Sequence, residues 1–110
     1  MDGTRLDAGA MAGGISAAHE RLAGTRRDLV AATDRLSEHE RRARVDNADT
    51  LLEAKNERTA SLYLDGILDT PEHADLVSAK RAAELAHYEA RLEVEKLGLL
   101  VRLLEATKDV

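Results

Sequence analysis

The sequence has few of the residues that most folds use to turn the chain and to fill a core. It contains no cysteine, one proline, two tyrosines, and neither phenylalanine nor tryptophan. Without cysteine, disulfides, thiolate catalysis and cysteine-ligated zinc are excluded, and an intracellular location is allowed. Without bulky rings, leucine and alanine must fill the core, which favours helices packed along their lengths. One proline also leaves too few turn positions for an all-β fold.

Positive charge and long apolar runs are scarce as well. The formal net charge is -5, from 16 basic and 21 acidic residues, so nucleic acid is an unlikely partner. The longest apolar run, at residues 97–101, is far shorter than the roughly 20 residues of a membrane span. Residues 1–14 lack the basic start and apolar stretch of a signal peptide. We therefore expect a cytoplasmic protein with no membrane partner.

A sevenfold apolar repeat begins at Ile15. Residues 1–14 show no apolar period, so we expect them to be a disordered tail. From Ile15 onward, leucine or isoleucine recurs every seven residues, and a second row of small or polar residues accompanies it. Because this narrow seam cannot stabilise an isolated helix, it needs a partner helix. The two rows are Ile15, Leu22, Leu29 and Leu36, and Ala18, Thr25, Ala32 and His39.

Two long helices account for the rest of the chain. The pattern predicts one helix over residues 15–68. Any bend in it is expected within the charged segment 37–47, where Ser37 could cap a new helix. Asp69-Thr70-Pro71-Glu72 predicts a turn at 68–71 and a second helix over 71–107. This second helix carries two sevenfold rows, which predict two buried sides. They are Leu85, Leu92 and Leu99, and Ala83, Ala90, Leu97 and Leu104.

Together these helices predict an all-α fold in one domain, residues 15–110. A short turn makes the helices antiparallel, with facing residue numbers that sum to about 139. The first helix then extends beyond the second, so we expect a long antiparallel hairpin, or coiled coil, that self-associates into a helical bundle. A three-helix bundle, formed if residue 15 onward folds back, is the alternative. The expected oligomer interface consists of Leu22, Leu29, Leu36, Leu97, Leu100, Val101 and Leu104.

One spacing on the second helix suggests a metal. Glu84 and His87 match the Glu-x-x-His spacing of di-iron carboxylate bundles, and the facing rule brings Glu53 and Glu57 opposite them. Two fixed letters arise easily by chance in a helix rich in glutamate, so exposed surface residues are the preferred interpretation. We expect no metal and no cofactor. Because no phosphate loop or nucleophile with a partnered base is recognisable, we also expect no enzymatic activity.

Arginines gather in the first helix and could contact phosphates. Arg41 and Arg42 alternate with Glu38 and Glu40, however, and no aromatic ring lies nearby to stack on a base. The spacing favours intrahelical ion pairs on a solvated face. Binding to DNA, or to a DNA-processing protein, remains an alternative function.

Part of the sequence resembles a known class of protein. Asn56-Glu57-Arg58 and Asp69-Thr70-Pro71-Glu72 flank Leu62, Leu64 and Leu68, and a long Ala/Leu/Glu helix follows. In this pattern, residues 48–104 resemble short helical-hairpin proteins encoded by phages and prophages, and the resemblance implies an accessory, non-enzymatic role. We therefore expect an interaction or scaffold protein that acts by self-association and protein binding. A metal-binding helical dimer is the other alternative.

Overall fold

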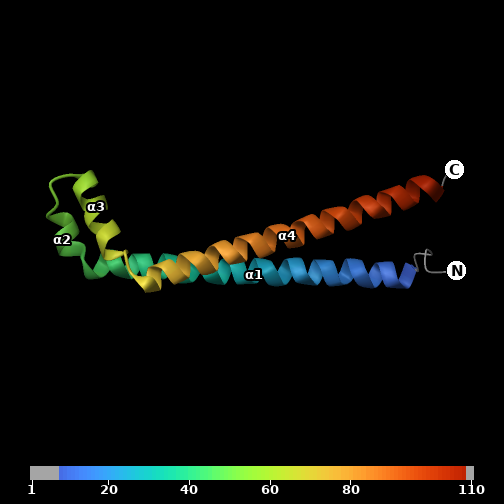
Figure 1. The fold of residues 1–110 in the computed structure, drawn as a ribbon, viewed down its shortest axis with the longest axis horizontal. Coiled ribbons are helices and arrows are strands. Elements are labelled where there is room, and N and C mark those ends of the chain that lie inside the picture. Colours follow the sequence, from blue (N-terminus) through green and yellow to red (C-terminus); the bar gives the residue numbers. More distant parts are fainter. Residues whose placement is uncertain (1–7, 109–110) are drawn as a thin grey trace. The chain divides into compact units, whose positions relative to one another are not determined.

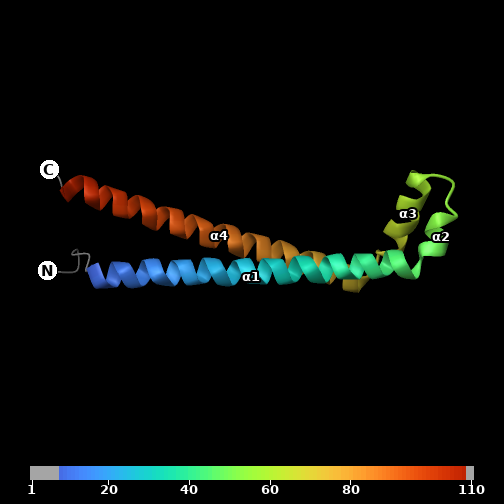
Figure 2. The same ribbon diagram turned by 180° about the vertical axis from the view of Figure 1, so that it is seen from behind.

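The computed structural model describes residues 8–108, and this part of the chain is helical with no strand (Figures 1 and 2). The helices are α1 (Ala8–Asp46), α2 (Ala48–Leu52), α3 (Glu57–Ile67) and α4 (Pro71–Lys108). The predicted all-α hairpin is confirmed, because α1 packs against α4. None of these four helices combines the length and the apolar composition needed to cross a membrane.

Helix α1 begins earlier and ends earlier than the sequence predicts. Of the expected disordered tail, residues 8–14 form the first turns of α1, and residues 1–7 lie outside the described part of the chain. No bend interrupts 37–46, and Ser37 is an exposed residue inside the helix. Within this charged segment, His39 and Glu40 contact the first turn of α4.

The single helix expected over 15–68 is wrong, because the chain leaves it at Asn47. There the Asn47 side-chain amide donates a hydrogen bond to the Ala43 carbonyl oxygen at 2.8 Å. That bond satisfies a carbonyl group at the end of α1. Residues 53–56 are non-helical, and Asn56 then starts α3 from an extended conformation. Its side-chain oxygen accepts from the Thr59 backbone amide at 2.8 Å, as N-capping asparagines do.

The predicted turn before the last helix is confirmed. Helix α3 ends at Leu68, and the chain turns through Asp69 and Thr70 into Pro71. The Thr70 hydroxyl oxygen accepts a hydrogen bond from the His73 backbone amide at 3.2 Å. Thr70 is therefore the capping residue of α4, and Pro71 occupies the first helical position, where its missing amide costs nothing.

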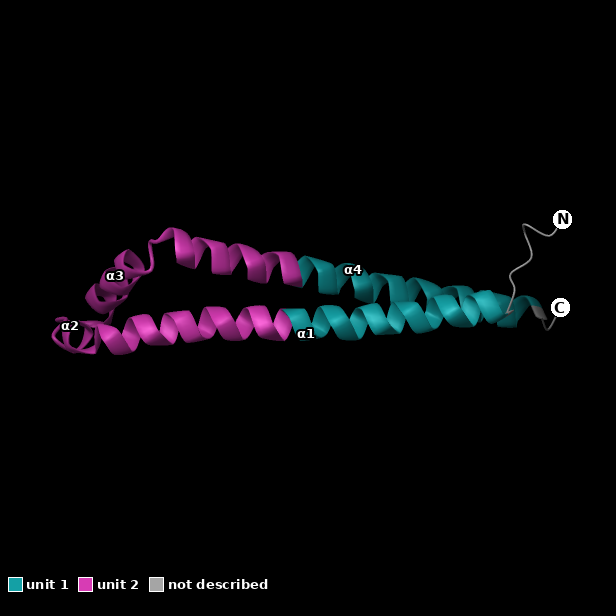
Figure 3. Cartoon of the chain, turned by 90° about the horizontal axis from the view of Figure 1, so that it is seen from below, with its two compact units in different colours: residues 1–28, 84–110 teal, residues 29–83 magenta. Residues whose placement is uncertain are grey.

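The chain divides into two compact units, each containing part of α1 and part of α4 (Figure 3). Among the described residues, unit 1 comprises 8–28 and 84–108, and unit 2 comprises 29–83. The buried core of unit 1 is Ala18 and Ala90, and that of unit 2 is Ala32, Leu36 and Leu68. Alanine at the contact allows helix backbones to approach closely. Four of these five buried residues come from the predicted rows, and the fifth, Leu68, lies at the end of α3.

The register between α1 and α4 differs from the predicted one. In unit 1, Arg21 forms an ion pair with Glu93, and Thr25 contacts His87. In unit 2, His39 lies beside Glu72, and Glu40 beside His73. The residue numbers in each of these pairs sum to about 112 rather than 139. The chain reverses over residues 47–70, not 68–70, so in unit 1 the part of α1 that was expected to lack a partner lies beside α4.

Candidate interaction surface

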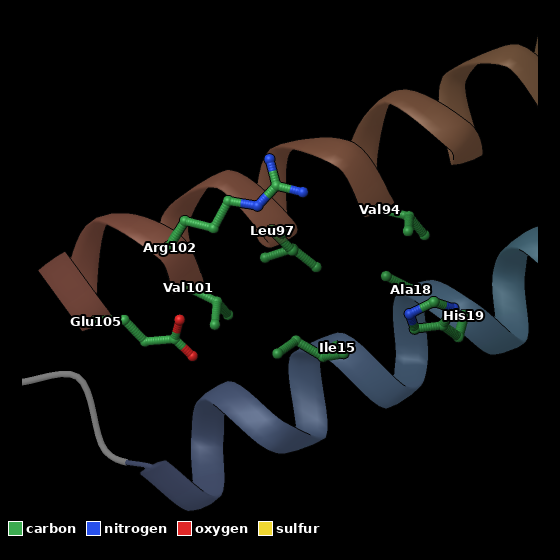
Figure 4. Close-up of a pocket in the computed structure, with 9 residues that line it drawn as sticks. Ile15, Ala18, His19, Val94, Leu97, Val101, Arg102 and Glu105 are labelled. Atoms are coloured by element: carbon green, nitrogen blue, oxygen red, sulfur yellow. The ribbon is translucent and has the colours of Figure 1, made fainter.

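An open apolar groove separates α1 from α4 in unit 1. Its volume is about 380 Å³. Ile15, Leu97 and Val101 point into the space between the two helices (Figure 4). The remaining lining residues are Ala18 and His19 on α1, and Val94, Gly98, Arg102 and Glu105 on α4. The groove therefore combines aliphatic walls with polar side chains of both charges.

Glycine contributes to the open space on the α4 side. Gly98 lies inside α4, and no atom lies within 4 Å of the position that a Cβ atom would occupy there. The sequence predicts only a helix-weakening role for this residue. In the structure, its missing side chain also leaves room in the groove wall.

The expected oligomer interface divides into two sets of residues. On α4, Leu97 and Val101 line the groove, and Leu100 and Leu104 are each 39% exposed. On α1, Leu22 and Leu29 are half-buried, and Leu36 is only 9% exposed. The α1 leucines belong to the row that α4 covers, so the accessible part of the predicted interface lies at the C-terminal end of α4.

Only one of the two predicted buried sides of α4 is covered within the described chain. Ala90 is 2% exposed, and Ala83 and Leu97 are half-buried. By contrast, Leu85, Leu92 and Leu99 are 58%, 45% and 56% exposed. The sevenfold spacing identifies this second row in the sequence. The spacing alone does not show that the row is exposed to solvent in the folded chain.

Unit 2 contains a cluster that sequence reasoning missed. The imidazole rings of His39 on α1 and His73 on α4 stack with their centroids 5.8 Å apart. Each ring also faces a carboxylate on the other helix: His73 Nε2 lies 3.3 Å from Glu40 Oε2, and His39 Nδ1 lies 3.7 Å from Glu72 Oε1. His39 belongs to the small or polar row of the sevenfold repeat, so this row provides a polar contact between α1 and α4. The sequence alone could not predict the contacts of His73, because they depend on the register between α1 and α4.

The candidate metal ligands do not come together. His87 Nδ1 lies 3.3 Å from the Thr25 hydroxyl oxygen, so Thr25 occupies the position that the facing rule gave to a glutamate. Glu53 follows α2, and Glu57 begins α3. Within residues 8–108, no group of three or more histidine, aspartate or glutamate side chains could hold a metal ion. The error follows from the register, which places His87 beside Thr25 in the middle of α1.

The predicted intrahelical ion pairs of the arginine-rich segment are present. Arg41 donates two hydrogen bonds to Glu38, at 2.9 and 2.7 Å, and Arg42 donates one at 3.1 Å. The Arg41 hydrogen bonds are the main reason why the Glu38 pKa is lowered to about 2. The Arg41 pKa is raised by the same hydrogen bonds. These arginines are already bound to a carboxylate, which makes them poorer phosphate ligands.

Comparison with known proteins yields no relative. No protein-family model matches the chain, and neither a curated protein nor a solved structure matches it.

Proposed function

We propose that this protein is a non-enzymatic helical-hairpin scaffold that acts through self-association, as an accessory factor of the phage type. The observation that carries the proposal is the accessible apolar surface at the C-terminal end of α4. There, the groove walls Leu97 and Val101 adjoin Leu100, Leu103 and Leu104, which are 39%, 62% and 39% exposed. Burying such a surface is favourable in proportion to the apolar area removed from water.

A second copy of the chain is the occupant that suits this surface. Two molecules with a net charge of -5 repel each other at long range, so an apolar contact must supply the attraction. The groove residues Arg102 and Glu105 have opposite charges and lie one turn apart on α4. In a two-fold symmetric contact, Arg102 of each copy can pair with Glu105 of the other copy.

Sedimentation equilibrium tests this function directly. We expect the wild-type chain to have a mass of at least twice 12.0 kDa at tens of micromolar. The double variant Leu100→Asp/Leu104→Asp should lower the association constant at least tenfold, because it places four charges in an apolar contact between two copies. Both residues are already partly exposed, so helicity measured by circular dichroism should be retained.

Leu62→Asp is the matched control. Leu62 lies on α3 in unit 2 and is 63% exposed, so the same chemical change there should leave association unaffected. A wild-type chain that unfolds cooperatively and remains monomeric at tens of micromolar contradicts the proposed function. Equal loss of association in Leu62→Asp and the double variant contradicts the assignment to α4.

A further inference from the structure

The side of α4 that faces away from α1 carries its own apolar row in unit 1. We call this row the outer stripe. Its members are between 45% and 62% exposed, and consecutive members are three, four or seven residues apart. They are Leu85, Tyr88, Leu92, Leu99 and Leu103.

Helix geometry prevents α1 from covering the outer stripe. Successive residues in a helix are about 100° apart, so Leu92 lies roughly opposite Ala90, the residue of α4 buried against α1 in unit 1. A sevenfold leucine row on a solvent-facing side is the pattern of a helix that packs against another helix. Within the described chain, this side of α4 is left without that helix.

We propose that the outer stripe packs against the outer stripe of a second copy, with the two α4 helices antiparallel about a two-fold axis at Leu92. In this arrangement, Leu92 meets Leu92, and Leu85 meets Leu99 of the second copy. The proposal rests on the self-association proposed above, but it assigns the contact to the outer stripe, which shares only Leu103 with the surface described there, and it gives the orientation of the two copies.

Charge complementarity selects the antiparallel orientation. Glu89 and Lys96 border the stripe on one side, and Glu84 and Arg102 on the other; all four are exposed. Pairing about Leu92 places Glu89 opposite Lys96 of the second copy, and Glu84 near Arg102 of the second copy. Two-fold symmetry makes each of these pairs occur twice. Tyr88 also comes beside Glu95 of the second copy, where its hydroxyl can donate to the carboxylate.

A parallel arrangement brings like charges together instead. In a parallel pair, each flanking residue approaches the residue five positions later on the other helix. Glu84 then approaches Glu89 of the second copy, and Arg91 approaches Lys96 of the second copy. In the same parallel pair, Glu95 would face Glu95 of the second copy, and Arg102 would face Arg102 of the second copy, near the contact between the helices. Like charges in such positions are destabilising, so repulsion between the flanking side chains disfavours the parallel orientation.

Charge exchange separates the two orientations. Sedimentation equilibrium at low salt should show a weaker association constant for Glu89→Lys and for Lys96→Glu, by about tenfold each, because two attractive pairs become repulsive. The double variant Glu89→Lys/Lys96→Glu should recover the wild-type value within about threefold. If Glu89→Lys strengthens association, or if the double variant fails to recover it, the antiparallel arrangement is overturned.

Cysteine cross-linking gives an independent readout, because the natural chain has no cysteine. Under mild oxidation, Leu92→Cys should form a disulfide-linked dimer by itself. Leu85→Cys and Leu99→Cys should form little dimer separately, but should cross-link when the two variants are mixed. Leu62→Cys, on exposed α3, is the control for random collision.

The outcomes distinguish this inference from the proposed function. If the wild-type chain self-associates but Leu92→Cys cross-links no faster than Leu62→Cys, the outer stripe is overturned and the scaffold function stands. If Leu85→Cys cross-links with itself as readily as Leu92→Cys, the antiparallel orientation is wrong. A monomeric wild-type chain overturns both.

Discussion

At the residue scale, polar side chains in this protein act through partners on the same or the facing helix. Glu38 binds two arginines on its own helix, whereas the stacked His39 and His73 connect two helices. The first kind of contact can be predicted from spacing alone, because residues three and four apart on a helix are neighbours. The second kind cannot, because it requires the register between helices.

Titration of Glu38 provides a prediction at this scale. Its pKa is lowered from 4.5 to about 2, first by the Arg41 hydrogen bonds and also by Arg42. A lowered folded-state pKa means that the carboxylate stabilises the folded chain above pH 4.5, and that this contribution is lost as the pH falls towards 2. Carboxyl chemical shifts measured by NMR should give a midpoint near 2.

Arg41→Gln supplies the control for that titration. Removing the strongest donor should move the Glu38 midpoint back towards 4.5, and Arg42→Gln should move it less, because Arg42 contributes a single, longer hydrogen bond. A Glu38 midpoint that is unchanged by Arg41→Gln contradicts the hydrogen-bond assignment.

At the scale of elements, capping residues determined where the helices end. Thr70 and Pro71 were recognised from the sequence, because threonine before proline is a strong helix start. Asn56, the N-cap of α3, was not recognised, although asparagine is a preferred N-capping residue. Asn47, whose side chain bonds to the end of α1, was not recognised either. The apolar residue type of Leu52 suggests a buried helix position, yet its side chain is 84% exposed. Residues 48–52 therefore looked like part of a longer helix.

The cap of α3 can be tested by mutation. Asn56→Ala removes the side-chain oxygen that accepts from the Thr59 amide and the Thr59 hydroxyl. We expect a loss of about 1 kcal/mol in the stability of α3. Amide hydrogen exchange at residues 59–62 should accelerate about fivefold. Asn56→Asp keeps an acceptor and should exchange at nearly the wild-type rate.

Lys55→Ala is the neighbouring control for the cap. Lys55 is exposed and precedes the capping residue, so its truncation should leave exchange in α3 unchanged. Equal acceleration in Asn56→Ala and Lys55→Ala would show that the cap does not stabilise α3.

At the scale of the whole molecule, the sequence supplied the helices and their buried rows but not their register. The heptad row of α1 correctly identified the side that meets α4, since Ala18, Ala32 and Leu36 are buried there. The facing rule failed because it needs the length of the connection between the helices. Two undetected breaks, at Asn47 and at 53–56, moved the reversal by many residues. The metal hypothesis and the expected overhang both depended on that rule.

Chemical cross-linking tests the register within unit 1. The Thr25 and His87 side chains meet at 3.3 Å, so a short thiol-reactive cross-linker should rapidly link the two cysteines of the double variant Thr25→Cys/His87→Cys.

Thr25→Cys/Leu85→Cys is the matched control, because Leu85 is two residues away from His87 but lies on the opposite side of α4 and is 58% exposed. Reaction at low concentration, followed by mass spectrometry of the monomer, restricts the readout to intramolecular links. We expect the first pair to close at least tenfold faster than the control, because proximity raises the effective concentration of the second thiol. Equal rates for the two pairs would show that α1 and α4 do not hold this register.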